Sequence, residues 1–296
     1  MKAWSEFHGD IKFNEPLSKY TYYKIGGPAD VVVSPSSLGE IKEVAEILRN
    51  TGEPFMCLGM ASNVLIADTG FKGTVIRLHK LNTEFSRLGE NHLQVGAGLP
   101  IMTLLRKTAE QGLAGLELWS GVPGSVGGAV VMNAGTSLGE TKDCLSSVEV
   151  FSLGDGSVRT LKAPFEYEYR KNHFLKKDDI VMSAVLKVQS SEPKAVKARL
   201  AELLEKRKQS QPVDLPSCGS VFKNPRPLSA WQVIEKLGLR GHRIGGAQFS
   251  EKHSNFIVNT GGAKASDVKG LIDLAKTRAK AELGVTLEEE VKLVGF

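Results

Sequence analysis

The chain has 296 residues, 41% of them hydrophobic and 24% charged, and a formal net charge of +5 at pH 7. This composition is typical of a soluble globular protein, and the length allows two or more domains with separate cores. No apolar run approaches the ~20 residues that a membrane span needs, and the first residues lack an apolar signal core. We therefore expect a cytoplasmic protein that does not bind membranes.

Cysteines and basic residues exclude further classes. Cys57, Cys144 and Cys218 lie far apart without a Cys-x-x-Cys pair, which favours reduced thiols over a disulfide framework or a metal site. The densest basic run, residues 206–208, ends an expected helix, where cations complement the helix dipole. We interpret it as a solvated helix end rather than a nucleic-acid-binding patch.

The front part of the chain predicts short strands with helices between them. In chain order these elements are a strand at 31–33, a helix at 38–51, strands at 55–58, 64–67, 74–78 and 92–95, and a helix that begins with Pro100 and stops at Gly112. Ser37 is placed to cap the first helix and Gly52 to end it. A small-residue turn at 59–63 follows a strand, where α/β folds commonly place a phosphate.

A break in composition at residues 209–216 separates the remaining elements of the chain into two groups. The elements before the break are a hairpin of strands at 147–153 and 157–161, a strand at 179–188 and an amphipathic helix at 193–208. Residues 209–216 read as a linker. The elements after it are a helix at 230–237, a strand at 255–259, a helix after Ser266 through 283 and a last strand at 291–294.

Residues 120–135 carry five glycines, one proline and mostly small side chains. Such a segment leaves the backbone bare, so its N–H groups could approach a phosphate-bearing cofactor. A buried tight turn is the alternative. The Rossmann fingerprint fails at residues 96–101, and no Walker A lysine loop exists. The loops at 58–65 and 120–135 are long enough to hold a dinucleotide between them.

Several motifs follow one another in a recognisable order. They are Tyr-Lys-Ile-Gly-Gly-Pro-Ala-Asp at 23–30, Ser-Asn at 62–63 followed by Asp68 and Gly70, Ser-Gly-Val-Pro-Gly-Ser-Val-Gly-Gly-Ala at 120–129, Met-Asn-Ala-Gly at 132–135, and Leu-Glu-Glu-Glu-Val-Lys-Leu-Val-Gly at 287–295. Together they resemble the bacterial UDP-N-acetylenolpyruvoylglucosamine reductases of peptidoglycan synthesis over nearly the whole chain. The missing loop between Arg170 and Ser220 resembles the shorter subclass, which lacks a substrate-covering tyrosine.

The resemblance implies an α+β fold. A two-part FAD-binding domain of the vanillyl-alcohol-oxidase type would occupy residues 1–200, with subdomains of about 1–80 and 81–200. A smaller α+β substrate-binding domain would occupy 201–296. The implied cofactor is non-covalent FAD, with NADPH as the hydride donor.

The residues expected to bind FAD lie in three segments. They are Ile25, Gly26, Gly59, Met60, Ala61, Ser62, Asn63, Val64, Gly121, Pro123, Gly124, Ser125, Gly127, Gly128, Ala129, Asn133 and Ala134. Ala61 departs from the family, which usually has glycine there, and its methyl group would crowd the pyrophosphate if the backbone has positive φ. Residues 58–65 contain no histidine, the residue that covalent flavin enzymes of the superfamily often carry in this loop.

The resemblance also names the catalytic residues. Ser220, in the motif Gly-Ser-x-Phe-Lys-Asn-Pro, would donate a proton to the substrate carbon. Arg170 would hold the substrate carboxylate, because its planar fork suits bidentate recognition. Glu290 would orient that carboxylate or share a proton with the enol form. Glu288 and Glu289 are competing candidates for the role of Glu290.

Three further residues are expected near the substrate. Lys223 and Asn224 would contact the uridine diphosphate, whereas His253 either lines the same cleft or lies on the surface. The leading hypothesis is reduction of UDP-N-acetylglucosamine enolpyruvate by a monomer that needs no macromolecular partner. A flavin oxidase or dehydrogenase of a hydroxy acid or sugar, and a flavin-binding module without turnover, are the alternatives.

Overall fold

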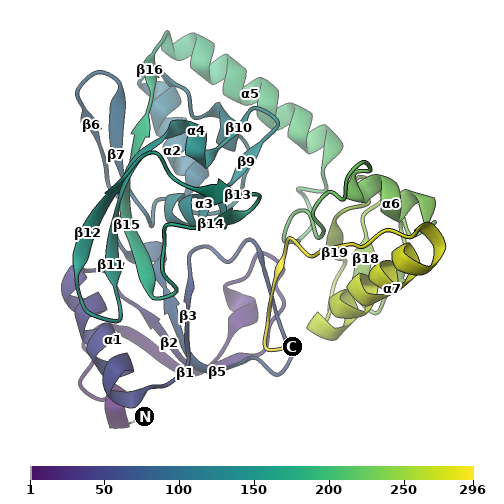
Figure 1. Ribbon diagram of the computed structural model, residues 1–296, viewed down its shortest axis with the longest axis horizontal. Coiled ribbons are helices and arrows are strands. Elements are labelled where there is room, and N and C mark those ends of the chain that lie inside the picture. Colours follow the sequence, from purple (N-terminus) through teal and green to yellow (C-terminus); the bar gives the residue numbers. More distant parts are fainter. Residues whose placement is uncertain (1) are drawn as a thin grey trace. The chain divides into compact units, whose positions relative to one another are not determined.

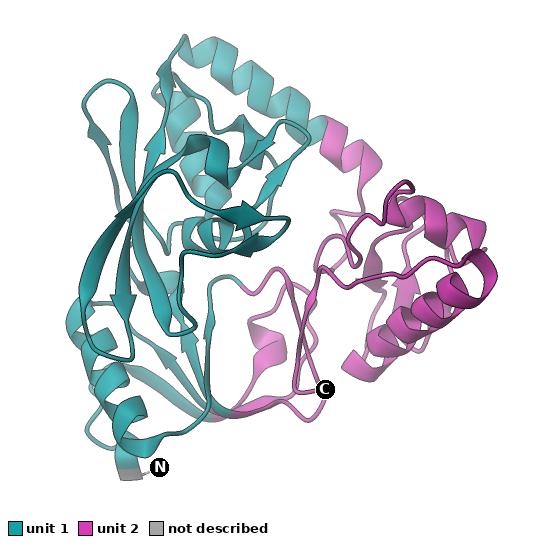
Figure 2. Cartoon of the chain, in the orientation of Figure 1, with its two compact units in different colours: residues 1–13, 31–60, 73–205 teal, residues 14–30, 61–72, 206–296 magenta. Residues whose placement is uncertain are grey.

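The computed structural model describes residues 2–296, and these form two compact units (Figure 2). The first unit runs up to Phe13 and continues over Val31–Met60 and Gly73–Glu205, and the second comprises Asn14–Asp30, Ala61–Lys72 and Lys206–Phe296. The segments 14–30 and 61–72 thus pack with the C-terminal part of the chain. No helix among residues 2–296 is both long and apolar enough to cross a membrane.

A five-stranded antiparallel sheet organises most of the first unit (Figure 1). Its strands, in spatial order, are β12 (Val158–Lys162), β11 (Leu145–Ser152), β15 (Asp179–Lys187), β7 (His92–Gly96) and β6 (Phe85–Leu88). Helices α2 (Ile101–Glu110) and α3 (Val126–Met132) contribute Leu104 and Val126 to the core beneath it, which Trp119 completes. Strand β15 is buried at six of its nine residues, as suits the middle strand of the sheet.

The second sheet has the order β1 (Asp10–Pro16), β2 (Pro28–Ser34), β5 (Phe71–Arg77) and β3 (Phe55–Leu58). Helix α1 (Leu38–Thr51) buries Ile41, Val44 and Leu48 in a core shared with β2. The Ser37 hydroxyl accepts the Glu40 N–H at 3.1 Å, and Gly52 ends the helix in the left-handed conformation.

The second unit packs two helices on a small sheet. Helices α6 (Ala230–Lys236) and α7 (Ala265–Leu283) share a core with the sheet β17 (Arg243–Ile244), β18 (Ala247–Phe249) and β19 (Ile257–Asn259). The same unit holds a parallel pair of β4 (Val64–Ile66) and β20 (Lys292–Val294), with Leu65 opposite Leu293. Strand β4 and the end of the chain are therefore neighbours within this unit.

The long predicted elements are confirmed, including α1, β3, β15, α5 (Pro193–Ser210) and α7. The expected helix start is wrong by one residue, because Pro100 is the N-cap and the helix begins at Ile101. The prediction also missed β1, β6 and α3. Helix α3 is only seven residues long and includes two glycines, which weaken a helical pattern.

Short elements complete the chain. They are the 3-10 helices Lys2–Trp4, Leu17–Lys19, Leu78–Lys80 and Glu117–Trp119, helix α4 (Thr141–Cys144), and strands β8 (Leu113–Ala114), β9 (Gly135–Thr136), β10 (Gly139–Glu140), β13 (Tyr167–Glu168), β14 (Lys171–Asn172) and β16 (Gln189–Ser190).

Candidate active site

The glycine-rich segment of the first unit is anchored along the residues that follow β7. The Gly127 N–H donates to Ala97 O at 2.9 Å, the Val126 N–H donates to Leu99 O at 3.0 Å, and Gly124 O accepts the Ile101 N–H at 3.0 Å. Val126 and Gly127 are the first two residues of helix α3. Part of the bare backbone expected to face a cofactor is therefore used to hold the segment in place.

The other predicted loop reaches this segment within the first unit. A Cβ added at Gly59 would lie 2.7 Å from the Ser125 hydroxyl oxygen, so a side chain there would displace this hydroxyl, which accepts the Gly128 N–H at 3.4 Å. Ser120 lies in the same segment, and its buried hydroxyl has no hydrogen-bond partner in the described structure. A bare backbone beside an unsatisfied buried hydroxyl fits a cofactor rich in oxygen, because such groups usually find a partner.

A hairpin ties Arg170 to the end of α3. The Tyr167 hydroxyl donates to Val130 O at 2.7 Å, the Asn172 amide donates to Val131 O at 2.9 Å, and the Arg170 guanidinium donates to Asn133 O at 3.2 Å. The last carbonyls of a helix have no partner inside the helix. Here the hairpin β13–β14 supplies those partners, and it places Arg170 beside the glycine-rich segment.

Arg170 holds a strained backbone conformation. It is the second of the two residues that join β13 to β14, and its φ is +57°. Glycine or asparagine usually takes such a position, because a side chain there costs roughly 1–2 kcal/mol. Its guanidinium lies 4.9 Å from the ring centroid of Tyr169. Strain of this kind at a charged residue points towards function rather than stability.

Asn133 closes α3 with its side chain directed into the protein. The residue is 1% exposed and has a φ of +45°. Its amide donates to the Glu140 carboxylate at 2.8 Å, and its side-chain oxygen accepts the Lys142 N–H at 3.0 Å. The side chain of this predicted FAD residue is thus already engaged, and its carbonyl receives Arg170.

In the second unit, Ala61 has a left-handed backbone conformation. Its φ is +50°, it is 7% exposed, and its carbonyl accepts the Tyr22 N–H at 3.3 Å. Ile25 is buried in the same core as Leu65. The backbone at residue 61 therefore meets the condition under which its methyl group is expected to crowd the pyrophosphate.

Ser220 and Glu290 lie on two segments that pair with each other in the second unit. The Val221 carbonyl accepts the N–H groups of Glu290 at 2.8 Å and Val291 at 3.4 Å, and Glu288 O accepts the Lys223 N–H at 2.9 Å. Two successive donors to one carbonyl are typical of a β-bulge, a device that re-aims side chains. The structure thus brings Ser220 and Glu290 onto adjacent extended segments, which an isolated bridge between Phe222 and Glu289 joins. Arg170 belongs to the other unit.

Asn63 holds the Glu290 segment from the side of β4. Its side-chain amide donates to Glu290 O at 3.2 Å, and its backbone carbonyl accepts the Lys292 N–H at 3.0 Å. Asn63 was expected to bind FAD, and the structure gives it this contact with the last strand.

The two glutamates that compete with Glu290 both form ion pairs. Glu288 lies 3.1 Å from Lys223 Nζ, and Glu289 lies 2.7 Å from Lys276 Nζ. The Asn224 side-chain oxygen accepts the Ala230 N–H at 2.9 Å, at the start of α6. Lys223 and Asn224 thus have partners within the second unit.

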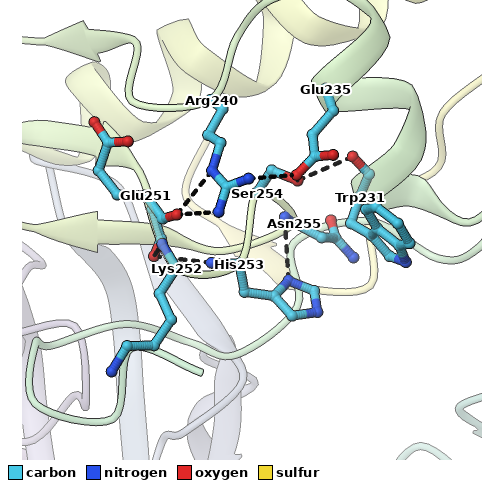
Figure 3. Close-up of polar contacts among 9 residues, drawn as sticks. Trp231, Glu235, Arg240, Glu251, Lys252, His253, Ser254 and Asn255 are labelled. Carbon is cyan, nitrogen blue, oxygen red and sulfur yellow. Dashed lines mark hydrogen bonds and ion pairs between the residues drawn. The ribbon is translucent and has the colours of Figure 1, made fainter. Parts of the chain in front are cut away.

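His253 lies in a polar loop that Figure 3 shows together with its neighbours. Its Nδ1 accepts the Asn255 N–H at 3.3 Å, and its ring meets Phe256 edge-on at 4.9 Å between centroids. Burial lowers the pKa of His253, so the neutral ring with an unprotonated Nδ1 is favoured at neutral pH. Among residues 2–296 no cluster of three or more His, Cys, Asp or Glu side chains could hold a metal ion.

Residues 29–162 match the family described as "FAD binding domain", and residues 211–294 match "UDP-N-acetylenolpyruvoylglucosamine reductase, C-terminal domain". UDP-N-acetylenolpyruvoylglucosamine reductases of Halalkalibacterium halodurans and Caulobacter vibrioides are 41% and 40% identical to the chain, each over 97% of it and 95% of the relative. The crystal structure of the reductase from Thermus caldophilus superposes with a TM-score of 0.81 at 36% identity, covering 97% of this chain and 99% of that one.

These similarities confirm the predicted α+β fold with an FAD-binding domain ahead of a C-terminal domain, and they confirm FAD as the cofactor. The residues of the first unit that would hold FAD are those around Gly59 and residues 121–129. The chain is an FAD-dependent oxidoreductase and belongs to the UDP-N-acetylenolpyruvoylglucosamine reductase family.

Proposed function

We propose that the protein reduces UDP-N-acetylglucosamine enolpyruvate to UDP-N-acetylmuramate for peptidoglycan synthesis in the cytoplasm, with NADPH as the hydride donor. Non-covalently bound FAD supplies the two-electron relay between NADPH and the enolpyruvyl double bond. The names of relatives that match over 97% of the chain support this reaction. The observation that carries it is the main-chain pairing of the Ser220 segment with the Glu290 segment.

Ser220 is the proposed proton donor. The preceding residue, Gly219, has a φ of +76° and open space where a Cβ would stand, so the turn leaves the serine approachable. A serine hydroxyl is a weak acid, but a carbon next to a conjugated carboxylate becomes a strong base once negative charge develops on it. A donor within hydrogen-bond reach of that carbon would complete the reduction.

Arg170 is the proposed partner of the substrate carboxylate. Its fork can bind two carboxylate oxygens at once and stabilise the charge that spreads onto them in the transition state. The strained turn that presents it supports this role. Glu290 would orient the same carboxylate or share a proton with the enol form, whereas its neighbours Glu288 and Glu289 form ion pairs with lysines.

The remaining assignments complete the proposal. Lys223 and Asn224 would contact the diphosphate of the substrate, and His253 would line the same site. FAD would be bound by the three predicted segments of residues 1–200, with residues 201–296 forming the substrate-binding domain of a monomer. The segment 61–66, which packs with the C-terminal part of the chain, would contribute to FAD binding as well.

Two mixing experiments under anaerobic conditions test the reaction. NADPH is expected to bleach the yellow enzyme, and the enolpyruvyl sugar nucleotide is expected to restore the flavin absorbance with formation of UDP-N-acetylmuramate. A hydroxy acid or a simple sugar that bleaches the oxidised enzyme would support the oxidase alternative. Bleaching by NADPH without reoxidation by the sugar nucleotide would refute the proposed substrate.

A further inference from the structure

We propose that Asn255 is a positioning residue that fixes Ser220 for proton donation; this inference rests on the proposed function. Asn255 is 3% exposed and comes from the loop that precedes β19, 35 residues after Ser220 in the sequence. Its contacts assign the role.

Asn255 forms three hydrogen bonds to the two residues that follow Ser220. Its backbone carbonyl accepts the Val221 N–H at 2.8 Å. Its side-chain oxygen accepts the Phe222 N–H at 3.0 Å, and its side-chain amide donates to Phe222 O at 2.9 Å. One side chain therefore serves both main-chain groups of Phe222, as a neighbouring strand would in a sheet.

The Ser220 segment is not part of any of the larger sheets. On one side it has the bridge between Ser220 and Phe256 together with the Asn255 contacts, and on the other side the Val221 carbonyl receives the Glu290 N–H. Val221 and Phe222 are buried at 0% and 1% exposure. Their four main-chain polar groups are all satisfied, three of them by Asn255, and buried groups of this kind need such partners.

The loop that carries Asn255 is itself held firmly (Figure 3). The Asn255 N–H donates to His253 Nδ1, the His253 N–H donates to the Ser250 hydroxyl at 3.3 Å, and the Ser254 hydroxyl donates to Trp231 O at 2.9 Å. Asn255 is thus a rigid clamp rather than a side chain that adapts to its neighbours. A donor that must reach one carbon depends on such rigidity, because a shift of ~1 Å can cost about 10²-fold in rate.

Asparagine suits this position because its amide presents a donor and an acceptor together. Alanine at 255 would leave the N–H and the carbonyl of Phe222 buried without partners. Aspartate would keep the acceptor for the Phe222 N–H but would place a second oxygen against the Phe222 carbonyl. We therefore expect both substitutions to loosen the Ser220 segment while the aspartate variant keeps the shape of the side chain.

The test measures the two halves of the reaction separately in single-turnover experiments on the whole enzyme. Asn255→Ala and Asn255→Asp are expected to slow reoxidation of the reduced enzyme by the enolpyruvyl sugar nucleotide about 10- to 100-fold. Reduction by NADPH should stay within about threefold of the wild type, because it requires no proton from Ser220. The solvent deuterium isotope effect on reoxidation should rise, since proton transfer becomes slower.

Asn259→Ala is the matched control. Asn259 is also a buried asparagine of the second unit, and its side chain donates to Tyr23 O at 3.0 Å and accepts the Gly261 N–H at 2.9 Å. Its loss should lower stability without changing the ratio of the two half-reactions. In a Ser220→Ala background, Asn255→Asp should slow reoxidation by less than about a further threefold, because the effects of residues that act as a unit are not additive.

Each outcome discriminates. If the Asn255 variants are reoxidised at the wild-type rate, or if Asn255→Asp multiplies the loss in the Ser220→Ala background, the positioning role is wrong while the proposed reaction stands. If the wild-type enzyme itself is not reoxidised by the enolpyruvyl sugar nucleotide, the proposed function fails and this inference fails with it.

Discussion

The glycine-rich segment of the first unit and the Ser220 segment of the second unit are held in place by different means. Residues 124–127 are anchored by main-chain hydrogen bonds, and the glycine at 59 lets the backbone come close to Ser125. The Ser220 segment also has main-chain bonds to Asn255 and Glu290, but both main-chain groups of Phe222 are held by the side chain of Asn255. A surface that binds through its backbone needs small residues, whereas a reacting side chain needs a clamp.

The two units also differ in the proposed role of a residue whose backbone is strained. Two of the residues with a strained left-handed backbone are Arg170, a proposed substrate ligand in the first unit, and Ala61, in a proposed cofactor loop of the second unit. Removing the side chain relieves strain in both cases. Only at Arg170 should this also remove a group that acts on the substrate, and the predictions below separate the two situations.

Arg170→Gly should have the largest effect on activity. Loss of the fork that is proposed to hold the substrate carboxylate should lower kcat/KM for the enolpyruvyl substrate by about 10²–10³-fold. The melting temperature should stay within about 4 °C of the wild type, because relief of the left-handed strain offsets the lost bond to Asn133 O. Steady-state kinetics and thermal unfolding measure the two effects.

Arg170→Lys separates the contribution of the positive charge from that of the planar fork. Lysine keeps the charge and the strain but loses the planar fork, so its activity should lie between those of the wild type and Arg170→Gly. If Arg170→Gly keeps the wild-type kcat/KM, Arg170 bonds to the Asn133 carbonyl at the end of α3 but does not bind the substrate.

Asp68→Ala should destabilise the second unit. The Asp68 carboxylate accepts the N–H groups of Ala265 at 2.8 Å and Ser266 at 3.0 Å, and so caps α7, whose own N-cap residue, Lys264, offers no side-chain acceptor. Loss of a cap costs about 1 kcal/mol, or about 2–4 °C in melting temperature for a chain of this size. Asp68→Asn, which keeps an acceptor, should lose less.

The contribution of Asp68 depends on pH. Burial acts to raise the pKa of Asp68, but the Ser266 and Ala265 N–H donors and the positive charge of Lys264 outweigh it, so the pKa lies below its ordinary value. The stabilisation is therefore fully present above a pH of about 4 and is lost as the pH falls through the lowered pKa. The difference between wild type and Asp68→Ala should shrink in that acid range, and a constant difference down to pH 3 would contradict the capping role.

Ala61→Gly should have the smallest effect, and it should be favourable. Relief of a left-handed alanine gains roughly 1–2 kcal/mol, whereas the extra freedom of glycine in the unfolded chain costs about 0.4–1 kcal/mol. A rise of about 1–3 °C in melting temperature is expected. Ala201→Gly is the control, since Ala201 is an exposed residue of α5 and should lose stability. An equal loss in both variants would contradict the strain at residue 61.

Local signals were sufficient for the long helices and for the central strands β11 and β15. Ser37 and Gly52 bound α1 because a cap and a left-handed stop act within one turn of the helix. The hairpin with β13 and β14 was missed, because its strands are two residues long and its partners are the carbonyls of α3. Helix α3 was missed because its two glycines weaken the helical pattern.

The site was predictable only as far as the motifs reach. Ser220, Arg170 and Glu290 could be named from the resemblance, and their roles stay predictions. Asn255 and the capping role of Asp68 carry no local signal, because their partners lie 33 and 197 residues away in the sequence. The Asn255 contacts form within residues 206–296, and the Asp68 contact joins the segment 61–72 to that part of the chain.

The central claim, that Ser220 delivers the proton, is tested most directly by Ser220→Ala in stopped-flow absorbance measurements of the flavin. NADPH should reduce the variant at nearly the wild-type rate, while reoxidation by the enolpyruvyl sugar nucleotide should slow by roughly 10²-fold or more, the usual contribution of a positioned proton donor. Equal slowing of both half-reactions, or wild-type reoxidation, would contradict that assignment.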